Sequence, residues 1–301
     1  MSNTLGTLSG ALILQKALDL VFTQRPLLKE ISLSFRELDG RVENALLGQS
    51  VKSRTRQVAT VNAFGTGPSS RSDADVSVTM SAIKEVHHSF TLAEVNSTDR
   101  DLVAESAEPI AVAMANHIID SVSALWIAAN FSTITVASGW SYANTVRALR
   151  KALNKAGVPR ANRFAVFNSD VYDSLLGDSL IIAALNNPSN GDAIRTGKLP
   201  EVSGLALDEY PDMPTTGNMV GFAGTPDSTV YVGRAPKDPR EMAPNLPFPG
   251  VFDYVEDPKT GFRVAVQQWI DPSTLSVNNR IAWLEGFAVG NTNNGIIVKT
   301  A

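Results

Sequence analysis

An alternation of apolar and polar side chains runs from residue 76 to residue 92. Even-numbered positions are mostly apolar and odd-numbered positions mostly polar, with interruptions at Ile83 and Lys84. A period of two predicts a β-strand with one buried face. Another extended run covers residues 51–64, and a polar loop with several glycine and serine residues follows it. We therefore expect a β-hairpin over residues 51–92.

The expected hairpin is too long for a compact domain. At about 3.3 Å per residue, residues 76–92 would extend roughly 56 Å, whereas strands in compact domains usually have about 3 to 10 residues. Such a strand either bends between two sheets or projects beyond its own domain. A projecting two-stranded ribbon has marginal stability in water, so its apolar face would need another surface, such as a second copy of the chain. We therefore predict self-assembly.

Basic residues alternate along the first strand of this hairpin. Lys52, Arg54 and Arg56 share one face of the strand. They either form a solvated face that discourages pairing at the strand edge, or pair with acidic groups on a neighbouring copy; both interpretations stay open. The inter-subunit residues that we predict in the hairpin are Lys52, Arg54, Arg56, Val76, Val78 and Met80.

A helical period replaces the strand period after the hairpin. Apolar side chains recur every three or four residues from Ile110 to Leu125, which predicts one face of a long helix. Thr98 and Asp101 fit a variant of the capping box at the start of this helix. We expect the helix over residues 99–130.

Short helices and short strands alternate in the rest of the chain. Ser141 is expected to cap a helix over residues 142–156, and Ser169 to cap another helix after a buried strand at residues 164–167. A proline-dense stretch at residues 236–249 is expected to be a linker or an extended surface crossing. An amphipathic helix is expected at residues 12–21, and further strands at 205–207, 219–222, 229–232, 262–270, 280–289 and 296–299. The predicted fold class is α+β.

The order of these elements resembles the major capsid proteins of tailed bacteriophages. A short N-terminal arm, a long hairpin, one long helix, a mixed α/β block and a β-rich return resemble the phage major capsid fold of the Hong Kong ninety-seven type over nearly the whole chain. The coat proteins of short-tailed phages are the most similar variant. Four stretches carry the resemblance best, namely residues 108–120, 149–169, 194–214 and 280–289.

The resemblance implies a division of the chain and a function. The implied parts are an N-terminal arm (1–50), an E-loop hairpin (51–92), a P-domain spine helix (93–132), an A-domain (133–235) and a β-rich P-domain return (236–301). The implied function is that of a shell subunit. Its copies form pentamers and hexamers that close into the icosahedral head of a virion around double-stranded DNA, assembled in the host cytoplasm. A separate scaffold protein and a portal are further implied partners.

Two other functions compete with this interpretation. An encapsulin-like bacterial compartment would have the same fold, with cargo enzymes inside instead of a genome. An enzyme of the α/β type belongs to a different class, and the sequence lacks a catalytic constellation for it. DNA inside particles would favour the phage shell, and a stable monomer with a deep polar pocket would favour an enzyme.

Composition narrows the chemistry further. The chain has 301 residues, no cysteine and three histidines, which excludes disulfides and thiolate metal sites. No stretch approaches the roughly 18 apolar residues of a membrane span. Residues 1–92 carry 10 basic and 8 acidic side chains, whereas residues 93–301 carry 16 and 22. The resulting net charges of +2 and −6 are not typical of a protein that binds nucleic acid through a basic face. We therefore expect DNA to be contained and not tightly bound.

Some stretches resemble catalytic or ligand-binding motifs, but each departs from the pattern that its chemistry requires. Residues 191–198 resemble a phosphate-binding loop, but five residues separate the glycines and Leu199 stands where Ser or Thr belongs. His87 and His88 are adjacent on a strand and point to opposite faces, so one should be half-buried and the other solvated, without chelating a metal. His117 is expected to be a packed or interface histidine, and a pH-sensitive role at an interface stays open. We therefore expect no catalytic residue, cofactor or metal.

Overall fold

The structure is a computed structural model. It describes residues 32–33, 47–54, 63–64, 75–97, 102–137, 139–181, 199, 201–242, 250–256 and 262–301. The helix expected at residues 12–21 lies outside the described residues. So do the polar loop at residues 65–74 and the motif at residues 191–198 that resembles a phosphate-binding loop. Within the described part, no helix is both long enough and apolar enough to cross a membrane.

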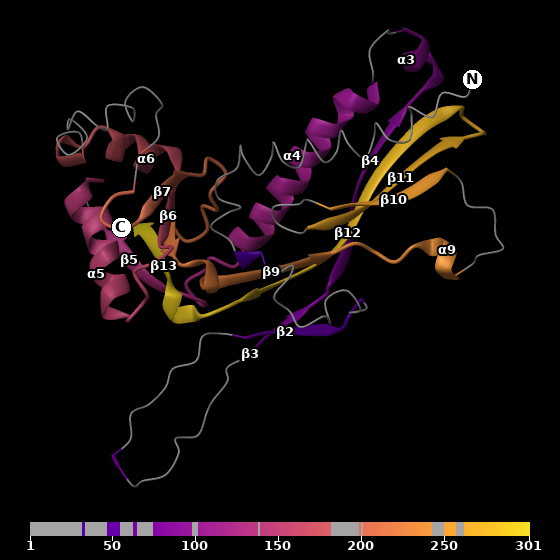
Figure 1. Cartoon of the computed structure of the whole chain (residues 1–301). Helices are drawn as coiled ribbons and strands as arrows, with labels where there is room; N and C mark the ends of the chain where they lie inside the picture. The colour runs from indigo at the N-terminus through magenta and orange to yellow at the C-terminus, as the bar shows by residue number, and fades with distance from the viewer. Residues whose placement is uncertain are drawn as a thin grey trace.

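The larger of two main sheets is built around one long strand, β12 (Ser276–Val289). The strand β4 (Ala82–Phe90) pairs with one side of β12, while β11 (Arg263–Asp271) and then β9 (Thr229–Arg234) pair with the other side. The outer strands are β10 (Val251–Glu256), which pairs with β11, and the short β1 (Ser32–Leu33), which pairs with β9. We call this six-stranded sheet the main sheet (Figure 1).

The second sheet has five strands and forms the core of a separate lobe (Figure 1). Its strand order is β5-β13-β8-β6-β7, so the last strand of the chain lies between two earlier ones. Two helices, α5 (Arg147–Lys155) and α6 (Ser169–Leu176), contribute buried leucines to the apolar core of this lobe. The five strands are β5 (Ser132–Val136), β6 (Phe164–Phe167), β7 (Ala206–Glu209), β8 (Met219–Gly224) and β13 (Gly295–Thr300).

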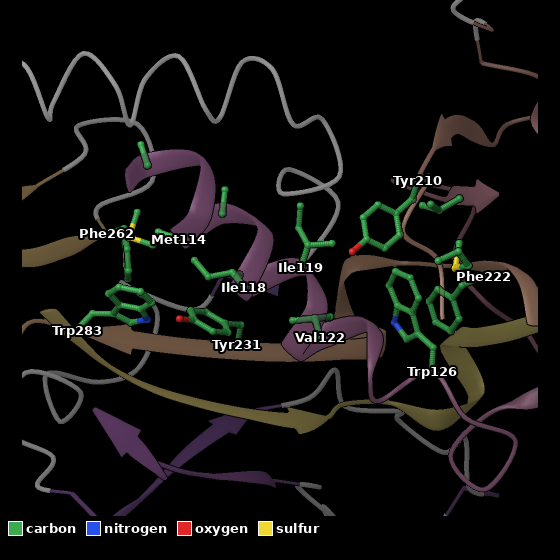
Figure 2. Packing of buried hydrophobic residues seen from close by; sticks show 14 of the residues in the cluster. Met114, Ile118, Ile119, Val122, Trp126, Tyr210, Phe222, Tyr231, Phe262 and Trp283 are labelled. Carbon is green, nitrogen blue, oxygen red and sulfur yellow. The ribbon is translucent and has the colours of Figure 1, made fainter. Parts of the chain in front are cut away.

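The helix α4 (Leu102–Ser123) packs its apolar stripe against one face of the main sheet. Figure 2 shows Met114, Ile118 and Val122 on the side of the helix that faces Trp283 and Tyr231. The predicted stripe is confirmed, since Ile110, Met114, Ile118 and Val122 are all buried. Burying one such side chain stabilises the fold by about 1.5–3 kcal/mol. A shorter helix, α3 (Leu92–Ser97), precedes α4.

The helix α4 ends earlier than the predicted residue 130. Turns replace it after Ser123, because Trp126 leaves the helix axis to stack on Phe222 of β8, with ring centroids 4.5 Å apart and the ring planes parallel within 1°. An offset or stacked aromatic pair adds about 0.5–1.5 kcal/mol beyond its buried area. The early end of α4 therefore ties the helix to the second sheet.

The predicted hairpin is correct only in part. The strands β2 (Ser50–Arg54) and β3 (Asp75–Thr79) do pair with each other antiparallel, in a two-stranded sheet of their own. The chain breaks its strand at Met80 and Ser81, and β4 then runs antiparallel to β12 in the main sheet. The expected run of residues 76–92 therefore passes from one sheet to another, which was one of the two alternatives, and backbone bonds at the break redirect the chain.

Two strands pair across the predicted boundary at residues 235–236. The strand β9 lies in the stretch 133–235 and pairs with β12 in the main sheet. The strand β13 lies in the stretch 236–301 and pairs with β5 and β8 in the second sheet. The pattern of side chains identified both strands correctly but did not identify their partners.

Two predicted helix caps differ in their outcome. Ser141 caps the segment η1 (Tyr142–Val146), a π-helical turn that leads into α5, and its hydroxyl accepts a hydrogen bond from the amide of Asn144. The cap of α6 is Asn168 and not Ser169, because the Asn168 side chain accepts from the amide of Val171. Asn and Ser are comparable as caps, so the choice between adjacent residues depends on backbone geometry.

Candidate assembly surfaces

The two strands β2 and β3, here called the hairpin base, lie on the face of the main sheet opposite to α4. Val78 and Met80 have 0% exposed surface and pack with Val51 of β2 and Leu284 of β12. Leu284 faces the hairpin base while its neighbour Trp283 faces α4, as expected for adjacent residues on a strand. The hairpin base is therefore part of the core of a single subunit.

Gly286 permits the close approach of β3 to β12. A Cβ atom at this position would lie 2.4 Å from the carbonyl oxygen of Thr79 and 3.1 Å from a methyl carbon of Val78. Backbone hydrogen bonds fix the same contact, since the amide of Ser81 donates to the carbonyl of Glu285 at 2.9 Å. Only glycine fits this gap without moving the hairpin base.

This geometry corrects part of the predicted interface. Val78 and Met80 were predicted to contact a second subunit, but they are wholly buried within their own chain. Val76 is partly buried against the same cluster. Of the basic residues, Lys52 is exposed and Arg54 lies opposite Asp75 in the register, while Arg56 is outside the described residues. The prediction for the three basic residues is not tested by this arrangement.

Phe64 is an exposed aromatic residue that the sequence analysis did not single out. Its side chain is fully exposed, and Figure 1 shows the short coloured segment of residues 63–64 far from both sheets. A bare phenylalanine at a projecting tip is unusual, because aromatic side chains gain most from burial. Its position beside the polar residues 65–75 was the available signal in the sequence.

The part of the main sheet that the hairpin base leaves uncovered carries aromatic rings and arginines. The guanidinium of Arg263 lies 4.2 Å from the ring centroid of Tyr254, and that of Arg280 lies 5.3 Å from the ring of Trp269. His87 also stacks on Trp269, with ring centroids 5.2 Å apart, and its Nε2 atom is 3.0 Å from the amide oxygen of Asn278. Tyr, Trp and Arg are the residues enriched at protein interfaces.

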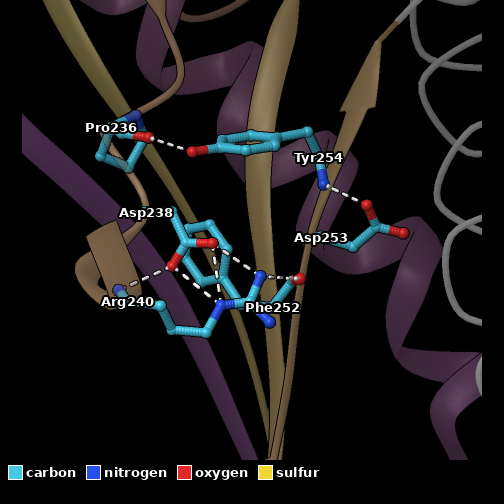
Figure 3. Close-up of polar contacts among 6 residues, drawn as sticks. All are labelled: Pro236, Asp238, Arg240, Phe252, Asp253 and Tyr254. Carbon is cyan, nitrogen blue, oxygen red and sulfur yellow. Dashed lines mark hydrogen bonds and ion pairs between the residues drawn. The ribbon is translucent and has the colours of Figure 1, made fainter. Parts of the chain in front are cut away.

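A short segment covers the outer edge of the main sheet (Figure 3). In α9 (Pro239–Met242), Arg240 pairs with Asp238 at 2.6 Å and also donates to the carbonyl of Phe252 on β10 at 3.1 Å. The hydroxyl of Tyr254 donates to the carbonyl of Pro236 at 3.1 Å. Because an open strand edge invites uncontrolled pairing, these bonds protect β10. The ion pair itself is exposed and contributes little stability.

A buried carboxylate lies between α4 and the main sheet. Glu285 is 1% exposed and accepts hydrogen bonds from His117 at 2.8 Å, from Trp283 at 3.1 Å and from Tyr231 at 3.2 Å. The ammonium of Lys84 lies 4.0 Å away. Burial raises the pKa of Tyr231 well above its usual value, so its hydroxyl remains a donor. The sequence signal for this site was a single acidic residue inside the apolar run of residues 281–288.

The predicted burial and packing of the histidines agree with the structure. On β4, His87 is exposed and His88 is partly buried, as expected for adjacent strand residues. His117 is a packed histidine on α4, in contact with Glu285. Among the residues that the structure describes, no group of three His, Cys, Asp or Glu side chains could hold a metal ion.

A hollow lies at the end of α4, lined by residues 120–127 and 212–216. Its polar groups include Asp120, whose carboxylate accepts a 2.5 Å hydrogen bond from the hydroxyl of Tyr210, and Asp212. Burial and the adjacent Asp120 raise the pKa of Tyr210. The hydroxyl of Ser123, which also lines this hollow, donates to the backbone carbonyl of Asp120 at 3.1 Å.

Comparisons with known proteins found similarity at the level of structure. No protein-family model matches the chain, and no curated protein matches it in sequence. A chain of Mycobacterium phage Che8 matches with a TM-score of 0.59 and 17% identity, over 83% of this chain and 84% of that chain. The capsid of the cyanophage P-SCSP1u matches with a TM-score of 0.60 and 10% identity, over 90% and 86%. A virus-like particle from Pyrococcus furiosus matches with a TM-score of 0.51 and 13% identity, over 95% and 98%.

The chain has the phage capsid fold. This confirms the predicted α+β fold of the Hong Kong ninety-seven type.

Proposed function

We propose that this protein is a major capsid protein, whose copies form pentamers and hexamers and close into an icosahedral head around double-stranded DNA. The observation that carries the proposal is the match of 83–90% of the chain to phage structures with TM-scores of 0.59 and 0.60. The match extends across both lobes and does not stop at one domain. An α/β enzyme has no comparable support among these neighbours.

Association is the chemistry that this function requires. A specific interface typically buries about 1,600 Å² in total, and a closed shell engages many interfaces at once, so weak individual contacts suffice. The uncovered face of the main sheet, with Trp269, Tyr254 and Arg263, is suited to such a contact because it combines exposed arginine with partly buried aromatic rings.

The E-loop supplies a second contact in this proposal. Its base is fixed to its own chain through Val78, Met80 and Gly286. Phe64 would then insert its ring into the surface of a neighbouring copy. Lys52, Arg54 and Arg56 carry positive charge along the same arm, and residues 93–301, with a net charge of −6, provide acidic partners.

Scaffold, portal and packaged DNA belong to the same proposal as partners, with the virion as the location and the host cytoplasm as the place of assembly. The net charge of −4 favours containment of DNA over tight binding by the subunit. A compartment filled with cargo protein is the alternative. It has weaker support, because the virus-like particle from Pyrococcus furiosus matches with a TM-score of only 0.51.

Purification of the full-length chain under native conditions tests the proposal. Light scattering and negative-stain microscopy should show large closed particles, or soluble subunits that form particles when a scaffold protein is added. Nuclease-resistant DNA in particles from infected or induced cells would support a phage head, and a protein cargo without DNA would support the compartment. A monomer that stays monomeric at every salt and protein concentration, with or without scaffold, would refute both.

A further inference from the structure

Glu285 occupies the position where four parts of the subunit meet. In the register of the main sheet it pairs with Ala82 of β4 on one side and with Gly233 of β9 on the other. Its carbonyl oxygen accepts the hydrogen bond from Ser81, at the break between the hairpin base and β4. Its side chain reaches in another direction and accepts from His117 of α4. The backbone of one residue thus holds the hairpin base while its carboxylate holds the helix.

Two buried donors converge on one oxygen of this carboxylate. Trp283 and Tyr231 each donate to Oε2, because the indole nitrogen can only donate and burial raises the pKa of the Tyr231 hydroxyl. Both donors come from strands of the main sheet, so the carboxylate is bonded to the sheet as well as to the helix.

Each element packed against Glu285 contributes one of its partners. Helix α4 provides His117, whose Nε2 atom is also 3.4 Å from the hydroxyl of Ser121. Strand β9 provides Tyr231, β12 provides Trp283, and β4 provides the positive charge of Lys84 at 4.0 Å. The carboxylate is therefore held by donors from three elements and faces a cation from a fourth.

We propose that Glu285 mechanically couples the hairpin base to α4, so that a change in the His117 hydrogen bond alters the stability of the Ser81 contact. The next residue, Gly286, lies directly against Thr79 and Val78, so there is no free space between β12 and β3 at this point. A shift of β12 at residue 285 is thus passed directly to β3. The coupling is a property of the single subunit; its use, to report docking of the E-loop on a neighbour to the spine helix, rests on the proposed function.

Hydrogen–deuterium exchange on the full-length, unassembled subunit tests the coupling. His117→Leu removes the donor, whereas His117→Gln retains an N–H at similar reach. We expect His117→Leu to accelerate exchange at residues 79–82 about fivefold or more, the lower range of typical coupling between sites. His117→Gln should restore slow exchange there. His88→Gln, on β4, is the matched control and should leave these amides unchanged.

The outcome separates coupling from a local or a general effect. Faster exchange confined to α4, or raised equally throughout the subunit, would overturn the proposal. If His117→Leu does not fold, Glu285→Gln takes its place, since it keeps the shape of the side chain and removes its charge, with the same criterion at residues 79–82. Because the measurement uses free subunits, its failure would leave the proposed shell function untouched, and failure of assembly would leave the coupling untouched.

Discussion

The base and the tip of the E-loop have opposite environments, although one run of sequence leads from one to the other. At the base, Val78 and Met80 are completely buried within their own subunit. At the tip, Phe64 is completely exposed. The hairpin base is therefore an extension of the core of its own chain, whereas Phe64 is exposed and, in the proposed shell, available to contact a neighbouring copy. An alternating pattern shows which face of a strand is buried. It does not show whether that face packs against its own chain or against a second copy.

The largest effect is expected from a charge at the base. Val78→Asp would place a carboxylate without a partner in the cluster with Val51 and Leu284, at a cost of about 3–5 kcal/mol. Most of the subunit should then be unfolded, as measured by circular dichroism melting. Ser77→Asp is the control, because residue 77 is exposed on the other face of β3. If Val78→Asp and Ser77→Asp had the same melting temperature, Val78 would contact a second copy and not the core of its own chain.

A smaller effect is expected from Gly286→Ala. The added methyl group would overlap the carbonyl of Thr79, and overpacking of this kind costs about 1–3 kcal/mol. We expect a folded subunit whose melting temperature falls by several degrees, with faster proteolysis of the E-loop. Gly177→Ala provides the control, since its nearest neighbour would be 3.7 Å away. A variant that melts like this control would show that the contact between β3 and β12 is looser than described.

The smallest effect on stability is expected at the tip. Phe64→Ser removes a side chain that is exposed in the subunit, so the free energy of unfolding should change by no more than about 0.5 kcal/mol. Particle formation, followed by light scattering, should nevertheless slow or stop, because the anchor for a neighbouring copy is lost. Normal assembly of this variant would remove Phe64 from the proposed interface and leave the basic residues of the arm as its candidate contacts.

The sequence predicted local structure well where the pattern was long and regular. The stripe of α4 and the strand at residues 164–167 were correct because burial on one side, or on both, fixes the period of apolar residues. The break at Met80 and Ser81 was missed, since the alternation continues through it with the same parity. The turn depends on backbone bonds to Gln49 and Glu285, which lie far away in sequence.

Pairing between distant strands was the part that the sequence could not provide. Nothing in the side chains of β9 or β13 distinguishes the main sheet from the second sheet, because both strands are buried on both faces for most of their length. Glu285 shows the same limit, since an acidic residue in an apolar strand signals a buried polar contact without naming His117 as its partner. Conversely, the resemblance to a capsid protein was detectable because it depends on the order of elements and not on their contacts.

The position of β13 in the second sheet also affects synthesis of the protein. Residues 295–300 lie between β5 and β8, yet they are translated after every other strand of that sheet. The ribosome synthesises a chain at about 5–20 residues per second. The strands β5 and β8 are therefore made several seconds before the strand that pairs with both of them. The second sheet therefore cannot be completed until residues 295–300 have been synthesised, which makes its completion a late step in the folding of the chain.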